Sequence, residues 1–166
     1  MNLLKRDPDD HQHFMGEALR EAGAAAERGE VPIGAVVAHA DSEVREARII
    51  GRGHNQTEML HDATAHAEML ALTQAAEALG NWRLTGCTLY CTIEPCTMCC
   101  GAMVLCRVDR LVYGAADPKF GAVVSIADVL SNPRHNHKVQ VISGVRADEA
   151  AAILQTFFQS LRKKGD

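Results

Sequence analysis

Apolar residues recur at intervals of three and four near both ends of the chain, and each of these segments predicts an amphipathic helix. The first predicted helix runs from His11 to Arg28, with Gly29 as its stop signal. The second begins near Asp148, a candidate N-cap, and continues toward the C-terminal end. Its apolar stripe consists of Ile153, Leu154, Phe157, Phe158 and Leu161.

The chain between these helices alternates between short apolar runs, typical of strands, and longer periodic segments, typical of helices. Strands are expected at residues 33–38, 47–53, 87–93, 110–114 and 139–143, and helices at residues 66–79 and 95–106. The first two strands flank a polar turn at 41–46, so we expect them to pair as a hairpin. Pro95 is expected in the first turn of its helix. This order predicts an α/β fold, in which a mixed five-stranded sheet has helices on both faces.

The composition indicates a globular protein. The chain has 166 residues and a mass of 18.0 kDa, with 47% hydrophobic and 23% charged residues. No repeat or linker divides it, so we expect one domain over residues 1–166, with residues 1–10 as a loose N-terminal segment. No apolar run approaches the roughly 20 residues that cross a bilayer. The N-terminal residues also lack the apolar core of a secretory signal, so we expect no membrane association and a cytoplasmic location.

The overall charge does not by itself indicate a nucleic-acid-binding protein. The net charge is −4 and the sequence pI is about 6.0. A polyanion would have to meet a local basic patch, and the candidates are Arg107, Arg110, Lys119, residues 134–138 and residues 162–164.

Six cysteines lie within residues 87–106, and clustered thiols in a reducing compartment indicate metal or redox chemistry rather than disulfides. Cys96 and Cys99 form a Cys-x-x-Cys pair at the start of a predicted helix, whose N-terminus favours thiolates. With the imidazole of His66 they suit Zn²⁺, and three protein ligands leave a fourth position open for water. Glu68 can reach that water and exchange protons with it. Such a site predicts hydrolytic deamination, in which hydroxide attacks an amine-bearing aromatic carbon and ammonia leaves.

The segments His66-Ala67-Glu68 and Pro95-Cys96-x-x-Cys99 resemble the motifs of the zinc-dependent nucleobase deaminases. Within that superfamily, the chain is similar to the bacterial tRNA-specific adenosine deaminases over nearly its whole length. The similarity includes residues 30–37, Asn55, residues 64–68, 92–96, 101–103 and 117–119, and the pair Phe157-Phe158. This resemblance implies a cytidine-deaminase-like three-layer sandwich.

The resemblance also implies a catalytic apparatus. One Zn²⁺ per chain would be bound by His66, Cys96 and Cys99. Hydroxide on that ion would attack C6 of adenine, and Glu68 would shuttle the protons. One departure from the family pattern is Cys100, which directly follows the second cysteine ligand and is expected to be a packed free thiol.

The substrate that the resemblance implies is the wobble adenosine in the anticodon stem-loop of an arginine tRNA, which is converted to inosine. Asn55 would hydrogen-bond the purine ring, Asp117 would lie beside the sugar, and Phe158 would contact the RNA from a final helix that helps to bind it. The protein would act as a homodimer. Because the anticodon is already single-stranded, extruding its base costs less than opening a duplex.

Alternative interpretations remain for several of these features. Asn55 and Asp117 are also ordinary turn residues, and Phe157 and Phe158 are also suited to core packing. The Cys-x-x-Cys pair is also found in thioredoxin-like redox proteins. The same chemistry would serve a deaminase of a free nucleobase or nucleoside, of the guanine or cytidine type. A non-catalytic zinc module that binds RNA is a further hypothesis, under which Glu68 would have no chemical role.

Overall fold

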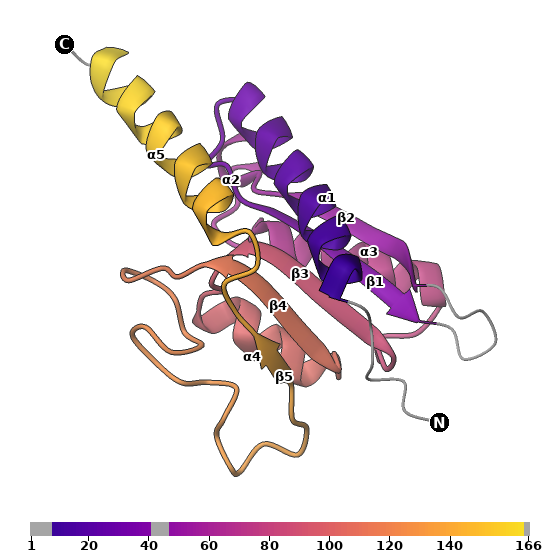
Figure 1. The fold of residues 1–166 in the computed structure, drawn as a ribbon. Coiled ribbons are helices and arrows are strands. Elements are labelled where there is room, and N and C mark those ends of the chain that lie inside the picture. Colours follow the sequence, from indigo (N-terminus) through magenta and orange to yellow (C-terminus); the bar gives the residue numbers. More distant parts are fainter. Residues whose placement is uncertain (1–7, 41–46, 165–166) are drawn as a thin grey trace.

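A five-stranded sheet forms the centre of the structure, a computed structural model that describes residues 8–40 and 47–164 (Figure 1). In spatial order the strands are β2 (Ala47–His54), β1 (Gly34–Ala40), β3 (Cys87–Ile93), β4 (Arg110–Ala115) and β5 (Gln140–Ile142). β1 is antiparallel to β2 and β3, whereas β3, β4 and β5 are parallel. The predicted hairpin and mixed sheet are confirmed, although the turn at 41–46 lies outside the described residues.

Helices cover both faces of the sheet, which confirms the predicted three layers. The helices are α1 (Pro8–Glu27), α2 (Thr57–Leu60), α3 (Ala67–Leu79), α4 (Thr97–Leu105) and α5 (Ala147–Lys164). The side chains of β3 alternate between the two faces. Tyr90 packs in the cluster that includes α1 and α5, whereas Leu89 and Cys91 pack in the cluster that includes α3 and α4.

Four helix starts differ from the sequence-based expectation, and that of α3 differs least, since it begins at Ala67 rather than at His66. α1 begins at Pro8, so residues 8–10 are helical rather than loose, while residues 1–7 lie outside the described chain. A proline is tolerated there because the first helical N–H groups have no intrahelical acceptor. α4 begins at Thr97 because Cys96 is extended, with a ψ of 175°, so Pro95 precedes the helix. Asp148 is not an N-cap, because the helix already starts at Ala147, after Arg146 with its φ of 53°.

The apolar stripe of α5 is packed only in its first half. Ala150 is buried and Ile153 is half-buried, but Phe158 and Leu161 are 43% and 48% exposed. Figure 1 shows the reason, since the second half of α5 projects away from the sheet. The interpretation of Phe158 as a core residue is therefore wrong. Within the described residues, no helix has both the length and the apolar content needed to cross a membrane.

Two glycines in β2 allow α3 to lie directly on the sheet. A Cβ atom on Gly51 would lie 2.2 Å from the carbonyl oxygen of Ala71, and one on Gly53 would lie 2.3 Å from that of Ala67. Real Cβ atoms essentially never approach other atoms more closely than 3.0 Å. The bare backbone of β2 therefore sets the position of the first turn of α3, which carries the candidate catalytic residues.

Candidate metal centre and its surroundings

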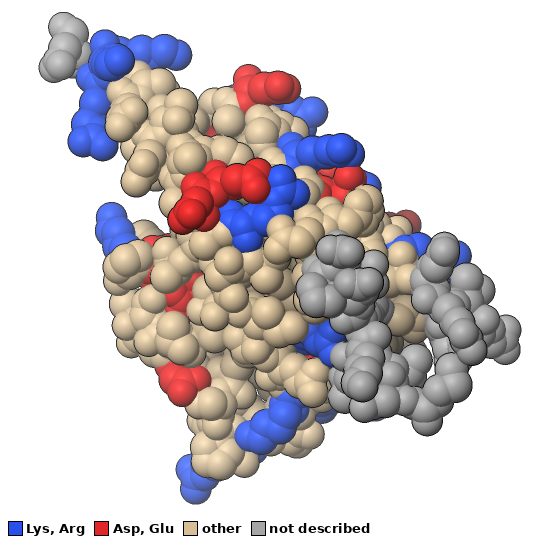
Figure 2. Space-filling view, in the orientation of Figure 1, with Lys and Arg blue, Asp and Glu red and all other residues tan. Residues whose placement is uncertain are grey.

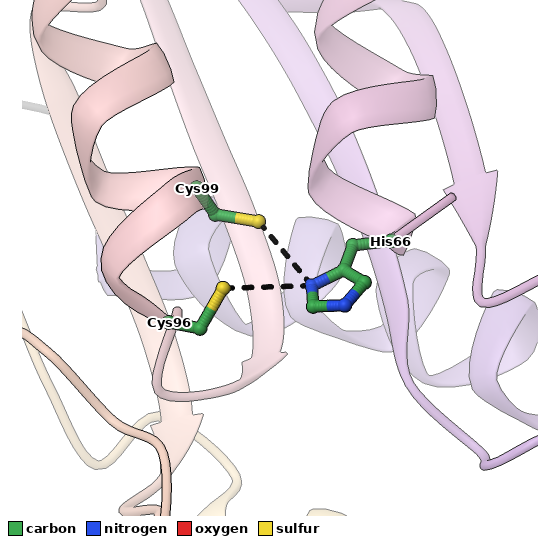
Figure 3. Close-up of side chains that lie close together, drawn as sticks. All are labelled: His66, Cys96 and Cys99. Carbon is green, nitrogen blue, oxygen red and sulfur yellow. Dashed lines mark hydrogen bonds between the residues drawn. The ribbon is translucent and has the colours of Figure 1, made fainter. Parts of the chain in front are cut away.

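The first residues of two helices bring together the three predicted metal ligands. His66 is the N-cap of α3, Cys96 is the N-cap of α4, and Cys99 lies in the first turns of α4. Neither N-cap side chain makes a capping hydrogen bond. Instead, the imidazole points across the gap between the helices toward both sulfur atoms (Figure 3). Residues 30 positions apart in sequence thus meet at one point.

The distances among these donors fit a tetrahedral zinc site. His66 Nδ1 lies 3.5 Å from the Sγ atom of Cys96 and 3.6 Å from that of Cys99, and all three ligand atoms lie within 4.8 Å of one another. A Zn–S bond of about 2.3 Å and a Zn–N bond of about 2.05 Å at the tetrahedral angle give an N–S separation of about 3.6 Å. The side chains therefore already have the spacing that zinc would impose, and His-Cys-Cys is a donor set that zinc favours.

The electrostatics of the two cysteines also suit metal binding. The thiol of Cys99 donates a hydrogen bond to Cys96, and this bond and the contact with His66 lower the pKa of Cys96 to about 3. The same hydrogen bond, together with burial, raises the pKa of Cys99. The site therefore holds a thiolate at neutral pH, which is the form of cysteine that ligates zinc.

Glu68 lies in the first turn of α3, next to this group, and only 3% of its surface is exposed. Burial raises the pKa of its carboxyl group, while a hydrogen bond donated by the thiol of Cys91 opposes that shift. Burying a carboxyl group is costly, and the position of Glu68 beside the three candidate metal ligands is one from which a carboxyl group could exchange protons with a water there. Cys91, on β3, is thus a neighbour of Glu68.

Asn55 directly follows β2 and is 6% exposed. Its backbone N–H donates to the carbonyl of Ile33, and its side-chain amide lies 3.4 Å from the hydroxyl of Thr57. The adjoining helix α2, which the sequence did not predict, is held by Glu30, whose buried carboxylate accepts the N–H groups of Glu58 and Met59. Asn55 therefore occupies a fixed position after β2, as a ligand-binding residue requires.

Asp117 begins a turn in the long connection between β4 and β5. Its carboxylate accepts the N–H groups of Lys119 at 3.0 Å and Phe120 at 3.2 Å, as a turn residue does. Its own N–H donates to Glu94 at 3.0 Å, which ties it to the strand that leads into Cys96. Phe158, in contrast, lies on the projecting half of α5.

Two buried acidic residues to which the sequence alone assigned no role hold segments of the chain in place. Glu94 and Glu30 are each 2% exposed; Glu94 accepts backbone N–H groups of the connection after β4, and Glu30 accepts those of two residues of α2. Burial alone would raise the pKa of Glu94, but hydrogen bonds from the Ser125 hydroxyl and from loop N–H groups outweigh it and lower this pKa to about 2. The sequence held a signal for Glu94, which directly follows an apolar strand. A carboxylate buried at such a position needs hydrogen-bond donors around it.

Cys100 packs away from the three ligands. It is fully buried, and its thiol donates toward the carbonyl of Pro95 at 3.7 Å. Burial raises the pKa of this thiol to about 12. The expectation of a packed free thiol at this position is confirmed.

The amino-acid sequence is similar to those of known deaminases over most of its length. The model of the MafB19-like deaminase family matches residues 9–162. The tRNA-specific adenosine deaminase of Bacillus subtilis is 49% identical over 151 residues, which cover 91% of this chain and 90% of that protein. The tRNA-specific adenosine deaminase of Agrobacterium fabrum is 48% identical over 153 residues, covering 92% and 97%.

Solved structures of deaminases share the fold. One from work on A-to-I editing by tRNA:A34 deaminases at the wobble position superposes with a TM-score of 0.79 at 49% identity, covering 86% of this chain and 99% of that one. A guanine deaminase from Nitrosomonas europaea gives a TM-score of 0.75 at 26% identity, with coverage of 92% and 85%. The same architecture thus serves both a tRNA substrate and a free base among these relatives.

Proposed function

The chain belongs to the family of tRNA-specific adenosine deaminases, within the MafB19-like deaminases, and from this premise we propose that it converts the wobble adenosine of a tRNA anticodon to inosine. The observation that carries the proposal is the juxtaposition of His66, Cys96 and Cys99 at zinc-like spacing with the buried Glu68 beside them. In this proposal residues 1–166 act as one deaminase domain in the cytoplasm.

His66, Cys96 and Cys99 would hold one Zn²⁺ per chain, which when bound supplies a Lewis acid that makes water a stronger acid. Glu68 then does the proton work: its carboxylate takes a proton from the attacking water and delivers it to a ring nitrogen of adenine. Glu68 next takes the proton of the new C6 hydroxyl and passes it to the exocyclic amine. The C6 carbonyl forms as the C–N bond breaks, and ammonia leaves with both electrons of that bond. Water and adenosine are consumed, and inosine and ammonia are formed, so Glu68 ends in its initial state.

Substrate recognition would use residues outside the metal-binding group. Asn55 would hydrogen-bond the purine, and Asp117 would lie beside the ribose. Phe158 and the basic end of α5, Arg162–Lys164, would contact the anticodon stem-loop. Figure 2 shows lysine and arginine side chains gathered at the projecting tip of this helix, where they meet solvent rather than the protein body. A local basic cluster of this kind can bind RNA although the net charge of the chain is negative, because salt screens distant charges and the phosphates interact mainly with nearby ones.

The arginine tRNA identity and the homodimer also belong to this proposal, because both follow from the family resemblance. A deaminase of a free base is the second candidate, supported by the fold shared with a guanine deaminase. The exposed Phe158 and the basic last turn of α5 favour RNA, since a free base has no phosphates for these cations to bind. A non-catalytic zinc module is disfavoured because it gives the buried Glu68 no task.

The direct test is to incubate zinc-loaded protein with an anticodon stem-loop that carries a wobble adenosine and to sequence the product for inosine. We expect inosine with wild type and none above background with Glu68→Gln, whose amide cannot carry the proton. Parallel reactions with free guanine, cytidine and adenosine measure ammonia. Inosine absent from a zinc-loaded wild-type sample would refute the proposed function, and rapid ammonia release from a free base would establish the second candidate instead.

A further inference from the structure

One buried carboxylate fastens an entire loop beside the candidate site. The segment that follows β4, residues 117–125, is called here the clasped loop. Glu94 accepts four of its backbone N–H groups, those of Asp117, Val123, Val124 and Ser125, at 2.8–3.1 Å. It also accepts the Ser125 hydroxyl. Five donors on one side chain satisfy a buried charge that would otherwise be very unfavourable.

The fit around this carboxylate leaves no spare room. A Cβ atom on Gly121 would lie 2.3 Å from both Cδ and Oε2 of Glu94, and 2.6 Å from the carbonyl of Asp117. The glycine is thus required for close approach. The loop is further joined to the ligand-bearing segment by a hydrogen bond of 2.8 Å from the N–H of Ala122 to the carbonyl of Pro95.

The clasped loop displays groups that suit an unpaired nucleotide strand. Lys119 is exposed and lies over the ring of Phe120 at 5.2 Å, and Phe120 is itself 57% exposed. An aromatic face and a cation are the two groups with which proteins bind single-stranded nucleic acid. Because Asp117 is in the same turn, the position of all three depends on the anchorage to Glu94.

We propose that Glu94 is a positioning residue for substrate recognition, which holds the clasped loop against the segment leading into Cys96 and so presents Asp117, Lys119 and Phe120 to the RNA. This inference rests on the proposed function, because it requires a nucleotide strand as substrate. Glu94 touches no reacting atom. Its loss should therefore weaken binding of ground state and transition state alike, which raises KM and leaves kcat nearly unchanged.

Glu94→Gln is the sharpest variant, because it keeps the shape of the side chain while it removes the negative charge and replaces one acceptor oxygen by a donor NH₂. One oxygen of Glu94 accepts three N–H groups and the other accepts that of Asp117, so the NH₂ of glutamine must face an N–H in either orientation. With the amide oxygen toward residues 123–125, the Asp117 end of the loop is released. Glu77→Gln makes the same chemical change on the exposed face of α3 and is the matched control.

The experiment measures zinc content, hydrogen exchange and steady-state kinetics on the anticodon stem-loop. For Glu94→Gln we expect one zinc per chain, faster exchange of the N–H groups of residues 117 and 123–125, and a KM raised about tenfold or more. We expect kcat within about threefold of wild type, and all values unchanged in Glu77→Gln. Ser125→Ala removes one donor without disturbing the others, and should raise KM by about threefold. This variant tests the proposal even if Glu94→Gln does not fold.

The outcomes separate this inference from the proposed function. If wild type forms no inosine, the proposed function fails. If wild type is active and KM is unchanged in the variants, Glu94 has no positioning role. Loss of zinc and of kcat in Glu94→Gln would also overturn the inference, since it would mean that Glu94 supports the metal ligands rather than the loop.

Discussion

Replacing Gly53 by alanine tests whether the bare backbone of β2 sets the geometry of the site. The new Cβ atom would lie 2.3 Å from the carbonyl oxygen of Ala67 and 2.9 Å from the nitrogen of Ala71, whereas ordinary contacts begin at 3.4 Å. Both opposing atoms belong to the backbone of α3, so no side chain can rotate away. The first turn of α3 must therefore move away by about 1 Å, which is the difference between 2.3 Å and the 3.4 Å of an ordinary contact, or the strand must bend.

Displacement of this turn should lower the activity, because His66 precedes it and Glu68 lies in it. His66 and Glu68 would move relative to Cys96 and Cys99, which lie on α4. A misplacement of about 1 Å can cost on the order of 10²-fold in rate. Overpacking of this kind also lowers the free energy of unfolding by about 1–3 kcal/mol, and about 2–4 °C in Tm is expected for each kcal/mol in a chain of this size.

The assay combines thermal unfolding with the rate of inosine formation, and Gly23→Ala is the control. Gly23 lies inside α1 with nothing within 4 Å of the position of a Cβ atom. Alanine there should raise stability by roughly 0.5–1 kcal/mol, since glycine is a poor helix residue. The reasoning is refuted if Gly53→Ala melts and reacts like wild type.

Three further predictions concern catalysis, the metal and pH. Glu68→Gln should retain zinc, as measured by metal analysis, while kcat falls about 10²–10⁴-fold or more through loss of general acid–base catalysis; loss of zinc in this variant would contradict the assignment. Treatment with a chelator should abolish inosine formation, and Zn²⁺ should restore it, while circular dichroism stays unchanged because the sheet and helices pack through their own apolar clusters; unfolding by the chelator would show that the ion is structural. The third prediction uses Arg52, which donates a hydrogen bond to Glu17 and lowers the pKa of that carboxyl below its ordinary value of 4.5. Glu17→Gln should cost up to about 1 kcal/mol of unfolding free energy, a modest figure because Arg52 is 43% exposed. That difference should be complete above pH 4.5 and disappear as the pH falls through the lower folded-state pKa, as denaturant titrations at several pH values would show; a difference that persists in acid would exclude the ion pair as its cause.

The sequence by itself determined the order of the strands and of the four longer helices, and it indicated which residues are candidate metal ligands. Periodicity reports which face of a helix or strand is apolar, and this depends only on neighbouring residues. The spacing Cys96-x-x-Cys99 at a helix start, with His66-x-Glu68 elsewhere, was enough to predict a zinc site because few other arrangements use these four residues together. The mixed sheet followed from the hairpin of 33–38 with 47–53.

Features that depend on distant contacts were decided only by the tertiary structure. No local pattern shows that Glu94 binds a loop 23–31 residues later, or that the apolar stripe of α5 leaves the body of the protein before Phe158. The helix start at Thr97 was also missed, because one residue with an extended backbone, Cys96, can move such a boundary. A stripe of leucine and phenylalanine shows that one face of a helix is apolar. Whether that face is buried depends on whether another part of the folded chain packs against it, as it does not at Phe158 and Leu161. Likewise, a carboxylate reveals its partners only when the chain has folded around it, because burial and hydrogen bonding are properties of the assembled molecule.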